Sequence, residues 1–489
     1  MKRVAAFSLV AAAVLPAAAA PQPPPLDRSI VEVLVACQNY DPHYPWQRLQ
    51  DRVRQGYGAV IRGSQVVTLE SLVRYHTLVE VRRAASGEKI EARVRLADPQ
   101  AGLALLDVPD PNASASLVPL PLAGFVSRSS TVEIVQMDDT AEFRRDGARV
   151  IQASVEQLPA APHSSLVLSL AADSGVDAEG APVLLDNALA GLVLRYSSSS
   201  RRATILPAPM IRRFLDDAQE APYEGLASAG LQWTPLVDAA KRSSLNVDKP
   251  GFGVLVLACL PGTGASESLR PGDVVIEWDG FPVDALGFYQ DPDYGRMALP
   301  YLILGRRKPG DSVGVRLVRN RAPMSAAVRL ARQTDDTAWI PEDLTDEQPP
   351  YLVEGGFIIR ELSGRYLLAY GAQWQTAADS RLVHLYLTRK HRPGKTGDRV
   401  VILSSVLPDP INVAYDHFRD EVVTHVNGRP VRNLRDVFRA RETDGSIHRV
   451  SLQSAGVELV LDRNDIADAN ARLAQRYRIP TLRRPPPAR

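Results

Sequence analysis

The chain has 489 residues, of which 45% are hydrophobic and 23% are charged, as in an ordinary globular protein with about three domains. A formal net charge of +1 excludes the basic footprint by which nucleic-acid-binding proteins attract phosphates, so no nucleic acid is expected as a partner. With 32 glycines, 38 prolines and only 6% aromatic residues, the composition favours many turns and short strands over long helices.

The N-terminus has the order of a secretory signal peptide. A basic "MKR" is followed by the apolar "VAAFSLVAAAVLP" and by the small residues "AAAA", which predicts a signal peptide over residues 1–20 and an exported protein, periplasmic or secreted. The alternative is a membrane anchor, but Pro16 interrupts the apolar run and no basic stop-transfer cluster follows, so no stable membrane insertion is expected. A Pro-rich leader occupies residues 21–27.

From residue 28 to residue 218, short apolar runs alternate with turns. Runs such as "IVEVLVA", "TVEIVQM" and "LAGLVLRY" predict a barrel or sandwich of β-strands. The segment "PAPMIRRFLDDAQ" then has helical spacing, with Met210, Ile211 and Phe214 on one face. Cys37 and Cys259 each lie in a separate apolar run, so two buried free thiols are expected rather than a disulfide or a metal site.

Three further segments follow. Residues 222–333 contain "GFGVLVLACLPGTGASESLRPGDVVIEWDGFPV" and a predicted hairpin, and an acidic linker covers residues 334–349. Residues 350–465 repeat the same order of strands, Gly-containing turns and helix, with an Asn-Gly turn in "EVVTHVNGRPV". The C-terminal tail, residues 466–489, begins as a helix and ends in "RRPPPAR", which predicts a solvated and disordered end.

The motif "LRPGDVVIEWDGFPV" resembles the core of a PDZ domain from the HtrA/Deg protease family. The stretch "PWQRLQDRVRQGYGAVIRGSQVVTLESLV" is similar to the opening of that family's trypsin-like domain, above all in the plant-type Deg branch. "YLVEGGFIIRELSGRYL" is similar to the second PDZ domain of that branch. The resemblance covers nearly the whole chain after residue 28 and implies a mainly β fold, a trypsin-like double β-barrel followed by two PDZ-like domains.

The resemblance also locates the positions of the catalytic triad. In the register of "TLESLV", Ser71 stands where the family has histidine, and in "GLALL" Gly102 stands where it has aspartate. A gapless alignment through Pro182 places Glu179 at the nucleophile and Asp177 at a glycine of the oxyanion hole. A serine nucleophile needs a base and a group that orients the base, so these residues predict a protein without catalytic activity or cofactor.

Two residues keep an active enzyme as an alternative. "DSG" makes Ser174 a candidate for a displaced nucleophile, and His76 is the histidine nearest to the family position. An ordinary turn serine and a surface or packing histidine are the other interpretations. The acids Asp173, Asp177 and Glu179 lack the ligand spacing of a calcium loop, so no metal is expected.

The PDZ resemblance implies capture of C-terminal or unfolded peptides by strand addition, next to a turn whose amides bind a carboxylate. In the first PDZ-like unit this turn is expected in "SAGLQW", and the candidate binding residues are Ala229, Gly230, Leu231, Gln232 and Trp233. In the second unit it is expected in "EGGFII", Glu354 to Ile359. The alternative in both units is a glycine turn that leads into a core strand. The aromatic residues Tyr40, Tyr44 and Trp46 lie where the family forms homotrimers, although core packing also accounts for them.

Overall fold

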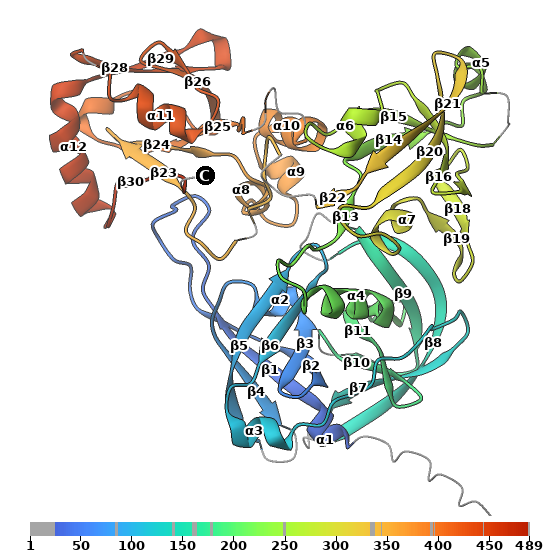
Figure 1. Cartoon of the computed structure of the whole chain (residues 1–489). Coiled ribbons are helices and arrows are strands. Elements are labelled where there is room, and N and C mark those ends of the chain that lie inside the picture. The colour runs from blue at the N-terminus through green and yellow to red at the C-terminus, as the bar shows by residue number, and fades with distance from the viewer. Residues whose placement is uncertain are drawn as a thin grey trace, which may run out of the picture.

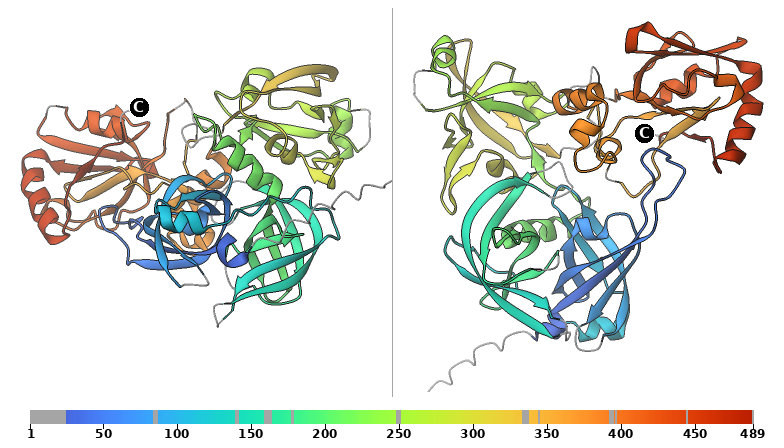
Figure 2. Two further views of the ribbon diagram at one scale, coloured as in Figure 1. Left: turned by 60° about the horizontal axis from the view of Figure 1, so that its bottom comes forward. Right: turned by 180° about the vertical axis from the view of Figure 1, so that it is seen from behind.

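The computed structural model describes residues 25–487 except 84–86, 139–141, 159–163, 177–178, 248–250, 333–337, 344, 392–394, 396 and 444. The expected signal peptide and most of the Pro-rich leader lie outside the described residues. The chain forms two barrels side by side, and two further units lie on the same side of the barrels (Figure 1, Figure 2). None of the helices within the described ranges is long and apolar enough to cross a membrane.

The first barrel closes in the strand order β1-β2-β3-β6-β5-β4, with antiparallel pairing throughout. The apolar residues of β1 fill its interior, and the buried Glu32 among them bonds to Gln55 and Arg82. The elements are α1 (Leu26–Ser29), β1 (Ile30–Cys37), β2 (Arg52–Arg62), β3 (Gln65–Leu69), α2 (Glu70–Val73), β4 (His76–Arg83), β5 (Lys89–Asp98), β6 (Leu103–Asp107) and α3 (Pro111–Ser116).

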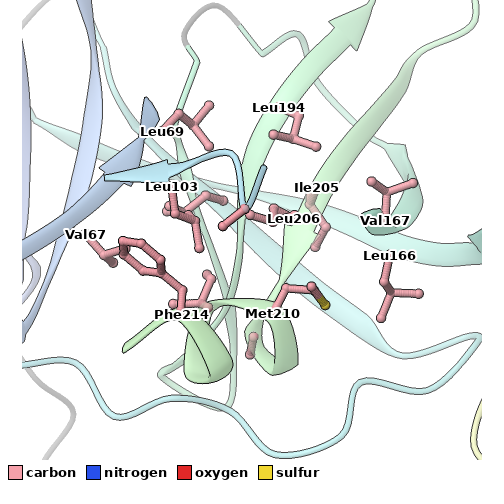
Figure 3. Close-up of a cluster of buried hydrophobic side chains, with 14 of the residues drawn as sticks. Val67, Leu69, Leu103, Leu166, Val167, Leu194, Ile205, Leu206, Met210 and Phe214 are labelled. Carbon is pink, nitrogen blue, oxygen red and sulfur yellow. The ribbon is translucent and has the colours of Figure 1, made fainter. Parts of the chain in front are cut away.

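The second barrel closes in the order β10-β11-β12-β9-β8-β7. Its elements are β7 (Thr131–Met137), β8 (Phe143–Gln157), β9 (Ser164–Ala172), β10 (Pro182–Leu185), β11 (Ala188–Ser197), β12 (Arg202–Pro207) and α4 (Ala208–Asp217). As the sequence spacing predicts, α4 buries Met210, Ile211 and Phe214. Figure 3 shows Phe214 beside Val67 of the first barrel, so α4 belongs to a core that continues from one barrel into the other.

The middle unit, residues 222–332, contains a sheet in the order β14-β15-β16-β20-β21. Because β14 pairs only with β15 within this sheet, β14 is an edge strand. The elements are β13 (Ala227–Ser228), β14 (Leu231–Pro235), α5 (Ala239–Ser244), β15 (Val254–Cys259), α6 (Gly264–Ser268), β16 (Val274–Trp278), β17 (Phe281–Pro282), β18 (Phe288–Asp291), β19 (Gly295–Ala298), α7 (Pro300–Leu304), β20 (Ser312–Arg319), β21 (Ala322–Arg329) and β22 (Ala331–Arg332). Both cysteine thiols are free, but only Cys37 is fully buried, because Cys259 lies on the partly exposed β15.

The C-terminal unit, residues 338–487, has a sheet in the order β29-β28-β26-β25-β24-β23-β30. Its strands are β23 (Tyr351–Glu354), β24 (Phe357–Glu361), β25 (Val401–Val406), β26 (Glu421–Val426), β27 (Arg429–Pro430), β28 (Ile447–Leu452), β29 (Glu458–Asp462) and β30 (Arg483–Arg484). Its helices are α8 (Gly364–Leu368), α9 (Trp374–Ala377), α10 (Ser380–Arg389), α11 (Leu434–Ala440) and α12 (Arg463–Arg476).

The C-terminal tail differs from its prediction. The helix α12 begins before residue 466, and its Leu473 is buried against β23. After it, β30 pairs with Tyr351 and Leu352, so residues 483–484 form the last strand of the sheet. The composition of "RRPPPAR" predicts a solvated end because its residues are charged or proline. Strand pairing, however, is made by backbone atoms, and composition carries no information about them.

The long loop between β1 and β2, residues 38–51, rises from the first barrel to the C-terminal unit (Figure 1). The Trp46 ring is 6% exposed and packs against Tyr351, with ring centroids 5.8 Å apart. Arg365 of α8 donates to the Tyr40 carbonyl at 3.1 Å. The aromatic residues of this loop are expected either to form trimer contacts or to pack within the chain. Trp46 packs within the chain, whereas Tyr44 remains 39% exposed.

Candidate functional site

Ser71 lies in α2, a single helical turn at the end of β3. A buried ion pair between Glu70 and Arg74 fixes this turn, with Arg74 Nε 2.8 Å from Glu70 Oε1. Arg54 Nη1 donates to the Ser71 carbonyl at 2.6 Å. The backbone around Ser71 is therefore held on both sides, and its hydroxyl is left on the partly exposed face of the turn.

Glu179 reaches the same place from the second barrel. The Ser71 hydroxyl donates to Glu179 Oε2 at 3.4 Å, a long hydrogen bond across the two barrels. The Glu179 carbonyl accepts from the Tyr57 amide at 3.0 Å. Gly180 follows with φ +78°, and a Cβ there would lie 2.4 Å from the Tyr57 carbonyl oxygen, so the turn needs glycine to approach β2 this closely.

Gly102 joins the group through its backbone, because its carbonyl accepts from the Glu70 amide at 3.0 Å. Its φ is +70°, and a Cβ on it would lie 2.8 Å from Leu158 Cδ1. An aspartate at this position would therefore strain the backbone and collide with a buried leucine. The structure thus places Ser71, Gly102 and Glu179 close together where the two barrels meet.

At these positions the side chains supply one hydroxyl, from Ser71, and one carboxylate, from Glu179, which accepts from that hydroxyl. Within the described part of the chain, neither Ser71 nor Glu179 is hydrogen bonded to a histidine. Asp177, the residue expected at the oxyanion hole, lies outside the described residues. No group of three His, Cys, Asp or Glu side chains suited to a metal is found in the described ranges.

The structure assigns separate partners to Ser174 and His76. Ser174 bonds to the Asp146 carboxylate on β8. Burial raises the pKa of Asp146, but hydrogen bonds from Arg144, Gln136 and Ser174 outweigh burial and lower that pKa. His76 Nδ1 lies 2.9 Å from the Val73 carbonyl and 3.6 Å from Asp346 Oδ2. No hydrogen bond joins Ser174 to His76 among the described residues.

The predicted peptide-binding residues lie on a free sheet edge. Gly230 has φ +69°, and a Cβ there would lie 2.3 Å from Thr263 Oγ1, so the turn before β14 requires glycine. The Leu260 amide donates to the Gly230 carbonyl at 2.8 Å, while Leu231 lies opposite Cys259. In this antiparallel register, Leu231 directs its amide and carbonyl away from β15, toward the open edge.

A cavity of about 270 Å³ lies along this edge. One wall consists of Ala229, Leu231 and Trp233, and the helix α7 supplies Ile303 and Leu304 opposite them. Sequence reasoning missed α7, although the apolar "LPYLIL" with proline in its first turn is a helix-start signal.

The C-terminal unit covers part of the same cavity. Ile340, Lys390 and His391 line it, and Lys390 Nζ is 3.0 Å from Glu342 Oε1, which places a lysine–glutamate pair at the mouth. Beyond it, Leu387 of α10 faces Leu257 and the β14 edge across a second hollow. These residues are more than 100 positions from β14 in the chain, and no local pattern connects them.

For "EGGFII", the structure supports the second of the two interpretations, a glycine turn that leads into a core strand. The strand β24 that follows "EGG" pairs with β23 on one side and with β25 on the other, so it has no free edge for a peptide. The Gly355 amide donates to Asn470 Oδ1 at 2.8 Å and is already occupied. The glycines Gly355 and Gly356 form a hairpin with φ of +57° and +93°, which is the core-strand interpretation of this turn.

Comparison with known proteins gives three findings. Residues 340–485 match the family model described as a PDZ domain. The putative mitochondrial protease Do-like 3 of Arabidopsis thaliana is 24% identical over 460 residues, covering 93% of this chain and 79% of that protein. The chloroplastic protease Do-like 2 of the same plant is 24% identical over 464 residues, covering 92% of this chain and 74% of the relative.

Among solved structures, a serine-to-alanine variant of the HtrA-type protease AlgW with a decapeptide superposes with a TM-score of 0.50 at 14% identity. The match covers 63% of this chain and 96% of that chain. At this identity the likeness establishes the fold, a double β-barrel followed by a PDZ domain.

Proposed function

Because this chain belongs to the HtrA/Deg-like protease family, we propose that it is a non-catalytic member that binds extended peptides at its middle unit, which precedes the residues 340–485 that match a PDZ domain. The observation that carries the proposal is the open edge of β14 facing α7 across a cavity of about 270 Å³. An extended peptide can add to such an edge, because main-chain hydrogen bonds supply affinity and an adjacent pocket holds one side chain.

Loss of catalysis rests on the residues where the two barrels meet. Serine-protease chemistry requires a base that takes the proton of the nucleophile, and neither the Ser71 hydroxyl nor Gly102 provides one at neutral pH. In the family register Asp177 replaces a glycine of the oxyanion hole, and an acidic side chain there would oppose the negative charge that develops on the substrate oxygen. Ser174 is bonded to Asp146 rather than to a histidine.

A peptide titration tests the binding proposal on the full chain. Peptides with an apolar C-terminal residue are titrated once with a free carboxylate and once amidated. We expect a dissociation constant of about 1 µM for the free form, corresponding to roughly 8 kcal/mol, and weaker binding of the amidated form. Equal affinities for the two forms would rule out carboxylate capture, and absence of binding to either would rule out the groove.

A fluorophosphonate probe tests the loss of catalysis independently. We expect no covalently labelled serine, because labelling requires an activated hydroxyl. Labelling that disappears in Ser174→Ala would instead establish the alternative, an active serine endopeptidase with rearranged residues.

We also propose that the chain is exported, on the order of basic, apolar and small residues at its N-terminus. The plant relatives are named as mitochondrial or chloroplastic, and those compartments are theirs. Fractionation of the source cells with N-terminal sequencing checks this. A mature chain that begins near residue 21 is expected, whereas an intact Met1 in the cytosolic fraction would refute export.

A further inference from the structure

A second cavity, of about 500 Å³, lies in the C-terminal unit, away from the peptide groove. Its walls come from the segment before β23, from β24, from α11 and from the residues after β30. Four arginines line it: Arg360, Arg399, Arg435 and Arg484. Guanidinium groups gathered in one hollow repel one another unless anions lie between them, so the acceptors of each arginine decide what the hollow can hold.

Within the described ranges, the hydrogen bonds of three of these arginines go to carbonyl oxygens. Arg360 donates to Pro42, Arg435 donates to Pro487, and Arg484 donates to Gln348 at 3.0 Å. Within the part of the chain that the structure describes, none of the three forms an ion pair with a carboxylate. Arg399 lies at the limit of an ion pair, 4.0 Å from Glu361 Oε2.

Of the four arginines, Arg360 has the greatest need for a hydrogen-bond or charge partner, because it is only 2% exposed. Among the residues that the structure describes, its Nε–H has no hydrogen-bond partner, and the Tyr366 ring lies 5.2 Å from its guanidinium carbon. Burial lowers the pKa of Arg360, although the nearby Tyr366 and Asp343 act to raise it. Buried donors without acceptors are rare in native proteins, and an unoccupied ligand site is one physical reason for them.

The carboxylates around the cavity are engaged or peripheral. Glu361 accepts from the Leu434 amide at 2.9 Å with one oxygen and faces Arg399 with the other. Asp343 accepts from the Thr345 hydroxyl at 3.3 Å, and Glu347 is exposed at the rim. The cavity is therefore lined by four arginines and by three acidic residues, Asp343, Glu347 and Glu361.

Six prolines also line the cavity: Pro341, Pro349, Pro350, Pro485, Pro486 and Pro487. Proline fixes φ and lacks an N–H, so these residues offer no donors of their own and lose little freedom when a ligand binds. Side-chain donors for a ligand then come from the four arginines and from Thr345, Gln348 and Ser363.

We propose that this arginine pocket binds an oxyanion of the phosphate type, either free or carried by a small organic molecule. Planar guanidinium groups match phosphate oxygens with paired hydrogen bonds, and the bond to an anion is stronger than the bond to a neutral carbonyl that it would replace. The volume exceeds that of one phosphate and lies in the range of small-molecule sites, which leaves room for an organic group.

Calorimetric titration of the full chain tests the pocket with inorganic phosphate, pyrophosphate and glucose 6-phosphate, each at constant ionic strength. Saturable binding of phosphate or pyrophosphate indicates a free anion, and preference for the sugar phosphate indicates an organic carrier. Arg435→Gln combined with Arg484→Gln should weaken the binding at least tenfold. The matched control is Arg439→Gln on the same helix α11, whose side chain is 76% exposed and should leave the affinity unchanged.

Three results would overturn the proposal. The first is that none of the three probes binds the unmodified chain in a saturable way. The second is that the double variant and the control bind the probes with equal affinity. The third is that added potassium chloride abolishes the binding to the extent expected from ionic strength alone. Circular dichroism of each variant verifies folding. Neither Arg435 nor Arg484 lines the peptide groove, so peptide affinity should not change in the arginine variants.

Discussion

Gly230→Ala is the substitution that most directly tests the geometry of the peptide groove. The residue has φ +69°, where a non-glycine residue costs about 1–2 kcal/mol. The new Cβ would also lie 2.3 Å from Thr263 Oγ1, and relieving that overlap adds about 1–3 kcal/mol. The two costs add up to about 2–5 kcal/mol. This cost would be observed either as a lower free energy of unfolding of the middle unit or as a displaced turn that weakens peptide binding.

The matched control is Gly262→Ala. Gly262 has φ +74°, but a Cβ there would meet nothing within 4 Å, so only the backbone cost of about 1–2 kcal/mol applies. Thermal unfolding and peptide titration are measured on the full chain for both variants. We expect Gly230→Ala to lose more stability and at least tenfold in peptide affinity, with Gly262→Ala close to the parent in affinity. Equal effects of the two substitutions would refute the contact with Thr263 and the role assigned to this turn.

Three further predictions follow from buried contacts. Trp46→Ala should weaken the packing of the β1–β2 loop against the C-terminal unit by about 3–5 kcal/mol. Limited proteolysis should then cleave that loop faster than in the parent protein. Glu70→Gln should destabilise the first barrel by about 3–5 kcal/mol in urea unfolding, because it leaves the Arg74 charge buried without its partner. Ser174→Ala should raise the pKa of Asp146 toward its ordinary value. Because a lowered carboxylate pKa contributes stability that is lost as pH falls through it, this variant should lose stability near neutral pH and match the parent at strongly acidic pH. An unchanged acid-unfolding curve would contradict the Ser174–Asp146 bond.

The fold follows from the sequence where local pattern and tertiary burial agree. Strands such as β1 alternate or run apolar, and α4 has its buried residues at helical spacing, so both are readable from neighbours in the chain. The β30 strand and the α10 cover over the peptide groove depend on partners more than 100 residues away. Pairing of that kind uses backbone atoms and shape, which leave no periodic signal in the sequence.

In the candidate site, too, some features could be predicted from the sequence and others depend on tertiary packing. The family resemblance was enough to select Ser71, Gly102 and Glu179, and the structure brings these three positions together. The left-handed conformation of Gly102 and the side chain of Leu158 that blocks its Cβ position depend on the packed barrels. For the same reason, restoring the family residues Ser71→His, Gly102→Asp and Glu179→Ser without enlarging the space beside Leu158 should not restore proteolysis.

The β1–β2 loop also has a consequence for the time course of folding. Its residues Asn39 and Pro42 bond to Arg365 and Arg360, with sequence separations of 326 and 318 residues. At a synthesis rate of about 5–20 residues per second, the ribosome needs roughly 16–65 s to produce the partners of a loop that is already made. During that interval the first barrel can close, but Trp46 stays in water beside a nascent chain. Until this long-range contact closes, the aromatic segment is exposed and accessible to chaperones and proteases.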